Sequence, residues 1–192
     1  MPNEKDEGKM KKCKVCHQPN PTPNSTCSIA CKIALMKAKD EQKRKDNATA
    51  LKNGEKPAKR QKTLKKKLKE EAWSLFSRFI RLKYADKNGN CTCVTCGTVK
   101  PWKEMQAGHA VGGRGGYVLF NEKIVRPQDY ACNCAQKGKY PEFIDYLVNK
   151  EKSLTMDEYF DILRESHKPH KLKESDYIEL ISVYTEKLKL FS

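Results

Sequence analysis

Nine cysteines fall mostly into two close groups, and the first group has the spacing of a zinc site. Cys13-x-x-Cys16 is followed by Cys27-x-x-x-Cys31. Four thiolates in two close pairs can close a tetrahedral zinc site, in which no position stays open for a substrate. We therefore predict a structural zinc that folds the short segment around these cysteines and takes no part in catalysis.

The second cysteine group adds a histidine to the same kind of pattern. The knuckle CVTC at 93–96 is followed by a second pair, Cys132 and Cys134. His109 lies between the two pairs, just before the glycine-rich stretch 112–116. The residues alone leave two interpretations of this histidine open. It is either a structural residue or zinc ligand, or a catalytic base that the zinc holds in place.

The cysteine count favours metal binding over disulfides. Nine is an odd number, and the N-terminal stretch MPNEKDEGKMKK holds no apolar segment of a signal peptide. No apolar run approaches the roughly 20 residues that span a bilayer. We therefore expect a cytoplasmic protein without a membrane partner, in a compartment that keeps thiols reduced.

The charge of the chain indicates a polyanionic partner. The 192 residues carry a formal charge of +15, with a sequence pI near 9.4 and a mean hydropathy of −0.83. The low mean hydropathy argues against a single large core. The high positive charge favours nucleic acid as the partner, with an anionic membrane surface as the alternative.

Positive charge is concentrated in the front of the chain. Residues 1–72 hold 20 of the 39 Lys and Arg but 9 of the 24 Asp and Glu. Helix formers break at Asn53-Gly54 and Pro57, and the apolar spacing that follows predicts a helix over about residues 63–85. A lysine run is usually a solvated helix face, but its place between two predicted metal sites favours contact with phosphate. The lysines concerned are Lys62, Lys65, Lys66 and Lys67.

The C-terminal part is predicted to be helical. Thr155-x-x-Glu158 resembles a capping box, and Ser175 is placed to cap a last helix. The simplest interpretation is that the apolar faces of these helices pack in the core or against a partner helix. They are also candidates for a homodimer interface. His167 and His170, in HKPH between them, are expected in an exposed loop. One face of the last helix is predicted to carry Tyr177, Ile181, Tyr184 and Leu188.

The order of the motifs resembles a known nuclease finger. After the knuckle come the AGH triplet at 107–109, a glycine-rich loop, a strand expected at YVLF (117–120), and a cysteine-bearing turn that leads to a helix near Pro141. This order resembles the ββα-metal, treble-clef-type finger of HNH nucleases. With the front cysteine module, the basic linker, CVTCGT, FNE at 120–122 and Cys132-Asn133, it resembles more specifically the phage recombination proteins of the NinG or Rap family.

The resemblance implies phosphodiester hydrolysis on branched DNA, such as D-loops and Holliday-type junctions. His109 is then the general base, and Asn133 matches the position of a ligand for a catalytic Mg²⁺ or Mn²⁺. Arg114 and Lys137 become candidates for phosphate contact. Recombination proteins of the phage or its host are the implied protein partners, in the cytoplasm of a bacterial host if the chain is phage-encoded.

Three positions depart from the family pattern. Asp129 stands where the family usually has the first cysteine of Cys-x-x-Cys-Asn, so Asp129 or Cys134 is the expected fourth zinc ligand, with Cys91 as a further alternative. Gly108 stands where many HNH enzymes have an aspartate. Ile124 stands where the middle asparagine of the motif would fall, and the nearby Asn121 is the candidate to replace it.

These features predict an α+β, mainly helical chain in four parts. They are a zinc module at 10–33, a basic helical linker at 34–72, an HNH-like zinc-stabilised nuclease domain at 73–150, and C-terminal helices at 151–192. The favoured function is a structure-selective DNA endonuclease. The alternative is a non-catalytic, zinc-containing DNA-binding or adaptor protein, which explains the charge and the cysteines but not the place of His109.

Overall fold

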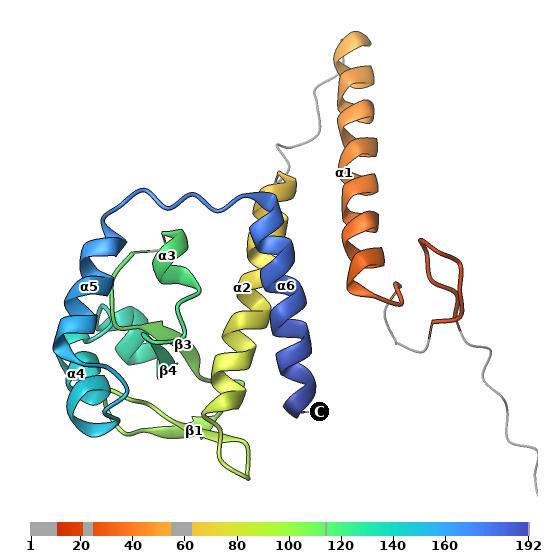
Figure 1. Cartoon of the computed structure of the whole chain (residues 1–192). Helices are drawn as coiled ribbons and strands as arrows, with labels where there is room; N and C mark the ends of the chain where they lie inside the picture. The colour runs from red at the N-terminus through yellow and green to blue at the C-terminus, as the bar shows by residue number, and fades with distance from the viewer. Residues whose placement is uncertain (1–10, 21–24, 55–62, 114, 192) are drawn as a thin grey trace, which may run out of the picture. The chain divides into compact units, whose positions relative to one another are not determined.

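The computed structural model describes residues 11–20, 25–54, 63–113 and 115–191. The chain divides into two compact units, Met1–Lys67 and Leu68–Ser192 (Figure 1). Helices predominate and the strands are short, which confirms the predicted α+β, mainly helical class. Lys62 and Arg114, two of the predicted DNA contacts, lie outside the described residues.

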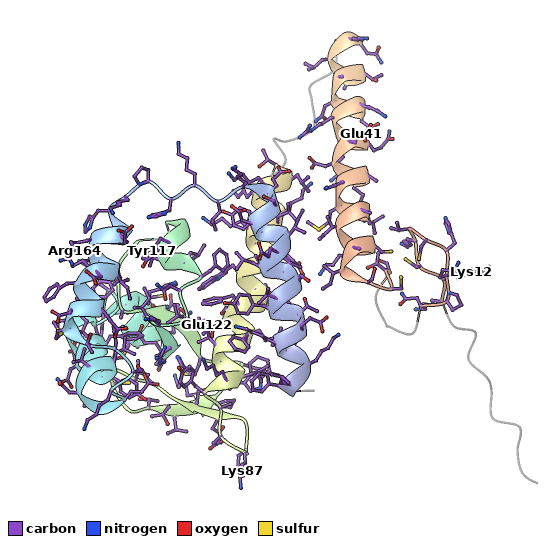
Figure 2. The ribbon with its side chains drawn as sticks, in the orientation of Figure 1. Lys12, Glu41, Lys87, Tyr117, Glu122 and Arg164 are labelled. Carbon is purple, nitrogen blue, oxygen red and sulfur yellow. The ribbon has the colours of Figure 1, made fainter. Side chains whose placement is uncertain are left out.

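The described part of the front unit is a cysteine-bearing loop followed by the helix α1 (Ile29–Lys52). Ser28 caps α1, because its hydroxyl accepts a hydrogen bond from the backbone N–H of Cys31 at 3.2 Å. The helix ends at Lys52, Asn53 is its C-cap, and Gly54 follows in the left-handed region, in agreement with the break predicted at Asn53-Gly54. Hydrophobic residues do not gather on one side of α1, whose buried residues are Ile33 and Asp40. Glu41 points outward from the helix (Figure 2).

The core of the second unit is built on α2 (Leu64–Lys83), which confirms the helix predicted over about 63–85. Phe76 of α2 packs edge-on against Tyr184 of α6 (Glu174–Leu188), with ring centroids 5.0 Å apart. The two helices lie side by side (Figure 1). The buried residues of α2 recur at helical spacing, so one face of the helix meets the core. They are Leu68, Ala72, Phe76, Phe79 and Ile80.

Two small antiparallel hairpins carry the middle of the second unit. β1 (Asn90–Thr92) pairs with β2 (Val99–Pro101), and the knuckle cysteines lie between or beside these strands. β3 (Gln106–His109) pairs with β4 (Val125–Gln128). All four residues of β4 are buried, because the strand is covered on both faces.

Short helical segments follow β4 and lead to the C-terminal helices. They are η1 (Ala131–Ala135), α4 (Tyr140–Asp145), η2 (Tyr146–Lys150), α5 (Met156–Ser166), α6 and η3 (Lys189–Phe191). The predicted capping box of α5 is present. Thr155 accepts from the N–H of Glu158 at 3.2 Å, and the Glu158 carboxylate accepts from the N–H of Thr155 at 3.0 Å. His167 and His170 lie after α5 in a loop, as predicted.

Two local predictions were wrong. YVLF was expected to form a strand, but residues Gly116–Leu119 form the short helix α3. Val118 and Leu119 are both buried, and a helical turn can bury two consecutive residues on a one-sided surface, whereas a strand would alternate them. Ser175 was expected to cap the last helix. The helix begins at Glu174, and the Asp176 carboxylate accepts from the Lys173 N–H at 2.7 Å instead.

None of the helices among the described residues is long and apolar enough to cross a membrane.

Truncating Phe76 tests the position of the core. We expect Phe76→Ala to lower the free energy of unfolding of the second unit by about 3–5 kcal/mol, because the fully buried ring leaves a cavity behind. Urea unfolding followed by tryptophan fluorescence measures this, since both tryptophans, Trp73 and Trp102, lie in this unit. Phe160→Ala is the matched control, because Phe160 is 46% exposed and should cost far less. Equal losses in both variants would contradict the described packing.

Candidate functional site

His109 lies at the end of β3 and opens onto a cleft of about 530 Å³ in the second unit. Trp73, Ser77 and Arg81, one turn apart on α2, form one wall. Asn133 lines the same cleft, so the structure brings together two of the three residues predicted to be catalytic. None of the described residues that line the cleft carries a carboxylate. The chemistry available there is therefore that of an imidazole, amides, a guanidinium and the hydroxyl groups of Ser77 and Tyr140.

One hydrogen bond fixes the protonation pattern of the His109 ring. Its Nε2 lies 3.2 Å from the carbonyl oxygen of Leu119. A carbonyl can only accept, so Nε2 carries a proton, and in the neutral form of the ring Nδ1 is the basic nitrogen. Trp73 stacks on the imidazole, with ring centroids 5.5 Å apart and an angle of 18° between the planes. The half-buried ring is thus held in one orientation and one tautomer, which suits a general base.

The two departures next to His109 have a structural explanation. A Cβ at Gly108 would lie 2.2 Å from Oε1 of the buried Gln128, so Gln128 fills the space that an aspartate side chain would need. Ile124 is fully buried in the hydrophobic core, and its carbonyl accepts from the N–H of Ala110 at 2.8 Å. The orientation of His109 is set by Leu119 and Trp73 instead, and the sequence carries no pattern that singles out a backbone carbonyl.

Asn133 is fastened to the strand that carries His109. Its Nδ2 donates to Oε1 of Gln106 at 2.7 Å, which ties η1 to β3. The Cys134 thiol lies 3.4 Å from the same oxygen. Because Nδ2 is engaged, Oδ1 is the acceptor end of the Asn133 amide. Gln106 also lines the cleft, and it was not among the predicted site residues.

The remaining predicted residues do not join the cleft. Asn121 lines a separate hollow of about 630 Å³, and its Oδ1 accepts from the N–H of Lys123 at 3.0 Å within a turn. Lys137 is exposed in the turn after η1. Lys65 and Lys66 are exposed in the first turn of α2, and Lys67 is half-buried there.

The first cysteine group forms a compact cluster of sulfur atoms. The sulfur atoms of Cys13, Cys16, Cys27 and Cys31 all lie within 4.8 Å of one another. Cys16 and Cys27 are 3.4 Å apart and Cys27 and Cys31 are 3.7 Å apart, between sulfurs. Four sulfurs bound to one tetrahedral zinc lie about 3.8 Å apart, so these residues fit the ion.

The electrostatics of this cluster also suit a metal. The backbone N–H of Cys16, with smaller contributions from Val15 and Cys27, lowers the pKa of Cys13 to about 6, despite burial of the sulfur. The crowding of thiols around Cys27, led by Cys16, raises its pKa to about 12. One sulfur is therefore already a thiolate at neutral pH, and a bound cation would remove the protons from the others.

The second cluster holds three sulfurs. Those of Cys93, Cys96 and Cys132 lie within 4.8 Å of one another, and the Thr98 hydroxyl, 3.2 Å from the Cys96 sulfur, lowers the pKa of Cys96 to about 7. The N–H of Asp129 donates to the Cys93 sulfur at 3.2 Å. These three residues fit a zinc ion with a fourth position left for another ligand.

None of the three candidates for that fourth ligand belongs to the cluster in this structure. Both carboxylate oxygens of Asp129 accept from Lys100, at 2.7 and 3.1 Å, and this lysine holds the pKa of Asp129 below its usual value. Cys134 contacts Gln106 instead. The thiol of Cys91 donates to the Arg81 carbonyl at 3.0 Å, and burial raises its pKa. The fourth ligand therefore stays a prediction.

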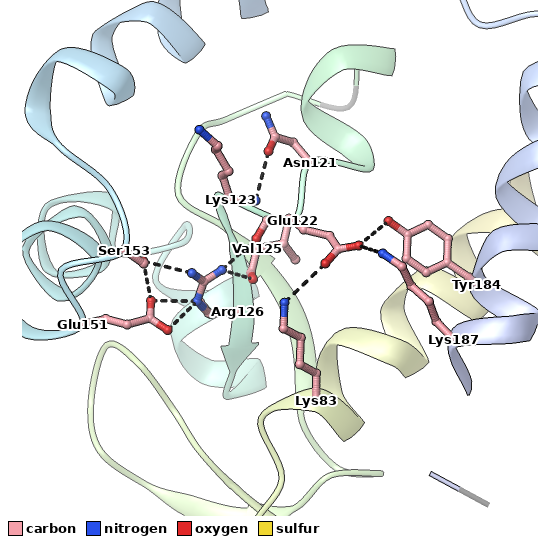
Figure 3. A network of polar contacts seen from close by, with 10 residues as sticks. All are labelled: Lys83, Asn121, Glu122, Lys123, Val125, Arg126, Glu151, Ser153, Tyr184 and Lys187. Atoms are coloured by element: carbon pink, nitrogen blue, oxygen red, sulfur yellow. Dashed lines mark hydrogen bonds and ion pairs between the residues drawn. The ribbon is translucent and has the colours of Figure 1, made fainter. Parts of the chain in front are cut away.

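A network of ion pairs anchors the loop that presents Leu119 to His109 (Figure 3). The Glu122 carboxylate accepts from Tyr184 at 3.0 Å and pairs with Lys187 of α6 and Lys83 of α2. Burial raises the pKa of Glu122, but the hydrogen bonds and charges of these partners outweigh it, so the pKa lies below its usual value. The loop is thus fixed to two helices at once.

Arg126 fixes the same loop from the other side. Its guanidinium is 3% exposed and pairs through Nε with both oxygens of Glu151, at 2.9 and 3.1 Å (Figure 3). It also donates to the carbonyl of Glu122 at 2.9 Å and to Ser153 at 3.1 Å. A buried guanidinium with these partners holds the beginning of β4 in place.

The comparisons with known proteins decide the family. The family model described as "Bacteriophage Lambda NinG protein" matches residues 4–192. The chain belongs to the NinG family. NinG proteins are phage recombination proteins, and the match spans both cysteine clusters and the His109 cleft. No curated protein and no solved structure matches the chain.

Removing one exposed sulfur tests the first cluster of this NinG-family chain. We expect about two zinc ions per chain as isolated, and we expect Cys16→Ser to lose one of them, because three ligands hold structural zinc far less well than four. Metal analysis of the purified protein gives the content. Limited proteolysis should also show a loosened segment around residues 11–31, since metal binding contributes to its folding free energy.

The matched control is Cys134→Ser, which removes another exposed cysteine outside both clusters. It should leave the zinc content unchanged. A loss of zinc in this control would identify Cys134 as the fourth ligand of the second cluster. An unchanged content in Cys16→Ser would contradict the four-sulfur site.

The Glu122 network predicts a pH dependence of stability. The folded-state pKa of Glu122 lies below its unfolded value, so its stabilisation is present at neutral pH and is lost as pH falls through the folded-state pKa. We expect Glu122→Gln to be less stable than the wild type at pH 7 and to approach it in acid. Urea unfolding over a pH series measures this. A constant difference at all pH values would exclude an ionised Glu122.

Proposed function

We propose that this NinG-family protein is a DNA endonuclease that hydrolyses phosphodiester bonds of branched DNA, with His109 as its general base. The observation that carries the proposal is the placement of His109, whose ring lines the cleft and whose Nε2 is held by the Leu119 carbonyl at 3.2 Å, so that Nδ1 is the basic nitrogen of the neutral ring. The cleft beside the ring and the formal charge of +15 support a DNA substrate.

The arrangement supports a direct hydrolysis. A water molecule in the cleft gives a proton to Nδ1 of His109 while its oxygen attacks phosphorus, and the bond from phosphorus to the leaving oxygen breaks. The Leu119 carbonyl stabilises the imidazolium that forms, because it accepts from Nε2. Arg81, on the α2 wall of the cleft, supplies positive charge near the phosphate.

The order of elements around His109 supports an HNH-type finger. The hairpin β3–β4 is followed by the helical segment η1, and His109 ends the first strand while Asn133 lies on the helical segment. The second sulfur cluster joins the knuckle at 93–96 to η1 through Cys132. A zinc ion there would fix the distance between the two parts that carry His109 and Asn133.

The cleft offers one predicted protein ligand to a divalent metal ion. Among the described lining residues, Asn133 is the predicted ligand, and its Oδ1 suits a hard cation such as Mg²⁺ or Mn²⁺ that takes its other ligands from phosphate and water. Such an ion stabilises charge on the phosphate and the leaving oxygen. The protein supplies the amide and holds it in place through Gln106.

A non-catalytic DNA-binding or adaptor protein is the second candidate. The observation that favours it is the lack of any carboxylate among the described residues of the cleft, since a catalytic metal is most often held by at least one. This candidate keeps both sulfur clusters as structural zinc sites and assigns the basic charge to DNA binding. Cleavage separates the two functions.

Replacing His109 tests the proposed function. We expect the wild type to nick labelled junctions and D-loops with Mg²⁺ or Mn²⁺, and His109→Ala to nick them about 10²–10⁴-fold more slowly, because the base is lost. His167→Ala is the matched control, since this histidine lies in the loop after α5, and it should cut at the wild-type rate. Wild-type protein that binds but never nicks would favour the second candidate. Nicking that survives in His109→Ala would exclude His109 as the base.

A further inference from the structure

Three cations surround one aromatic ring at the turn between β2 and β3. The guanidinium carbons of Arg81 and Arg78 lie 5.4 and 5.9 Å from the centre of the Trp102 ring, and the ammonium of Lys103 lies 5.7 Å from it. Arg78 and Arg81 come from adjacent turns of α2, and the other two residues are neighbours in the turn. Cation–π attraction offsets part of the repulsion among the three charges.

Arg81 holds this turn against α2 without losing its charge. Its Nη1 donates to the carbonyls of Trp102 and Met105, each at 3.3 Å, and its Nε donates to the Ser77 carbonyl at 3.1 Å. Carbonyls are neutral, so they satisfy the guanidinium but do not neutralise it. Burial, and less strongly the nearby charge of Arg78, lowers the pKa of Arg81. The cluster of Arg78, Arg81, Trp102 and Lys103 is therefore rigid at its base and remains cationic.

The charge of the cluster has no acidic partner within the described part of the chain. No ion pair joins a described carboxylate to Arg78, Arg81 or Lys103. Other cations of the unit differ, since Lys100 pairs with Asp129 and Lys83 with Glu122. Arg78 and Lys103 are also exposed, so their charged ends are open to a ligand. A fixed group of three unneutralised cations is a site for an anion with several oxygens.

The cluster adjoins the His109 cleft. Arg81 belongs both to the cluster and to the wall of the cleft, and its hydrogen-bond partner Met105 also lines the cleft, so an anion bound at the cluster lies at the rim of the proposed catalytic site. A DNA strand places successive phosphates only a few ångströms apart, and a strand whose scissile phosphate faces His109 must continue past this rim.

We propose that Arg78, Arg81 and Lys103, gathered on Trp102, bind a backbone phosphate of the DNA strand that enters the His109 cleft. The proposal rests on the proposed function for the identity of the polyanion. The indole limits the freedom of the two long exposed side chains, which lowers the entropy lost on binding. The contact is to the backbone, so it positions the strand and does not select a base sequence.

The double variant Arg78→Gln/Lys103→Gln tests the site while leaving Arg81 to hold the turn. Binding of fluorescent duplex and junction DNA is measured by anisotropy over a salt series, without divalent metal, so that no cleavage occurs. We expect weaker binding of every DNA by about the same factor. We also expect the slope of log affinity against log salt to fall by about 1, because the contact to one phosphate is lost.

The matched control is Arg164→Gln/Lys168→Gln, which removes the same two charges from exposed positions near the end of α5. It should keep the wild-type slope within about 0.5. Equal slopes for the cluster variant and the wild type would overturn the proposal. An equal fall in both variants would also overturn it, because the effect would then be one of net charge.

A local signal adds a second measurement. In a Trp73→Phe background, Trp102 is the single tryptophan, and DNA bound at the cluster should change its emission. The change should disappear when Arg78 and Lys103 are also replaced by glutamine. Trp102 emission that stays unchanged when DNA is added would overturn the proposal. A protein that shows these effects but never nicks DNA would disprove the endonuclease and leave the phosphate site standing.

Discussion

The hydrogen bond between His109 and the Leu119 carbonyl is the interaction on which the candidate site depends. This hydrogen bond forms only if the end of α3, which carries Leu119, stays close to the end of β3. The core is arranged to ensure this, because Glu122 fixes the loop to α2 and α6 and Arg126 fixes it to the segment around Glu151. The orientation of the His109 imidazole thus depends on ion pairs formed by residues several positions away along the chain.

The sulfur ligands and the oxygen ligands of the chain lie at different sites: sulfurs in the two cysteine clusters, and amide oxygens in the His109 cleft. The two sulfur clusters suit zinc, whose role is to hold short segments that have too few apolar residues to fold by burial alone. The cleft offers amides and an imidazole but no described carboxylate, so any cation there would be held loosely and shared with the substrate. Under the proposed function, the folding of the two cysteine segments and the chemistry of the cleft would respond to different metals.

Much of this arrangement could be predicted from the sequence because it depends on local spacing. The first sulfur cluster, α2, the capping box at Thr155 and the end of α1 follow from motifs of a few residues. The strand expected at YVLF failed because tertiary burial of two consecutive residues outweighed β propensity. The wall formed by α2, the Leu119 carbonyl and the cations around Trp102 depend on contacts between distant segments, for which one sequence carries no signal.

The close approach of Gln128 to Gly108 makes these two positions depend on each other. They lie on neighbouring strands of one hairpin, with Gly108 opposite Arg126 and the glutamine two residues further along β4. An aspartate at 108 therefore requires the glutamine side chain to move or a smaller residue to replace it. The effect of a substitution at 108 thus depends on the residue at 128, so the two positions are expected to show epistasis.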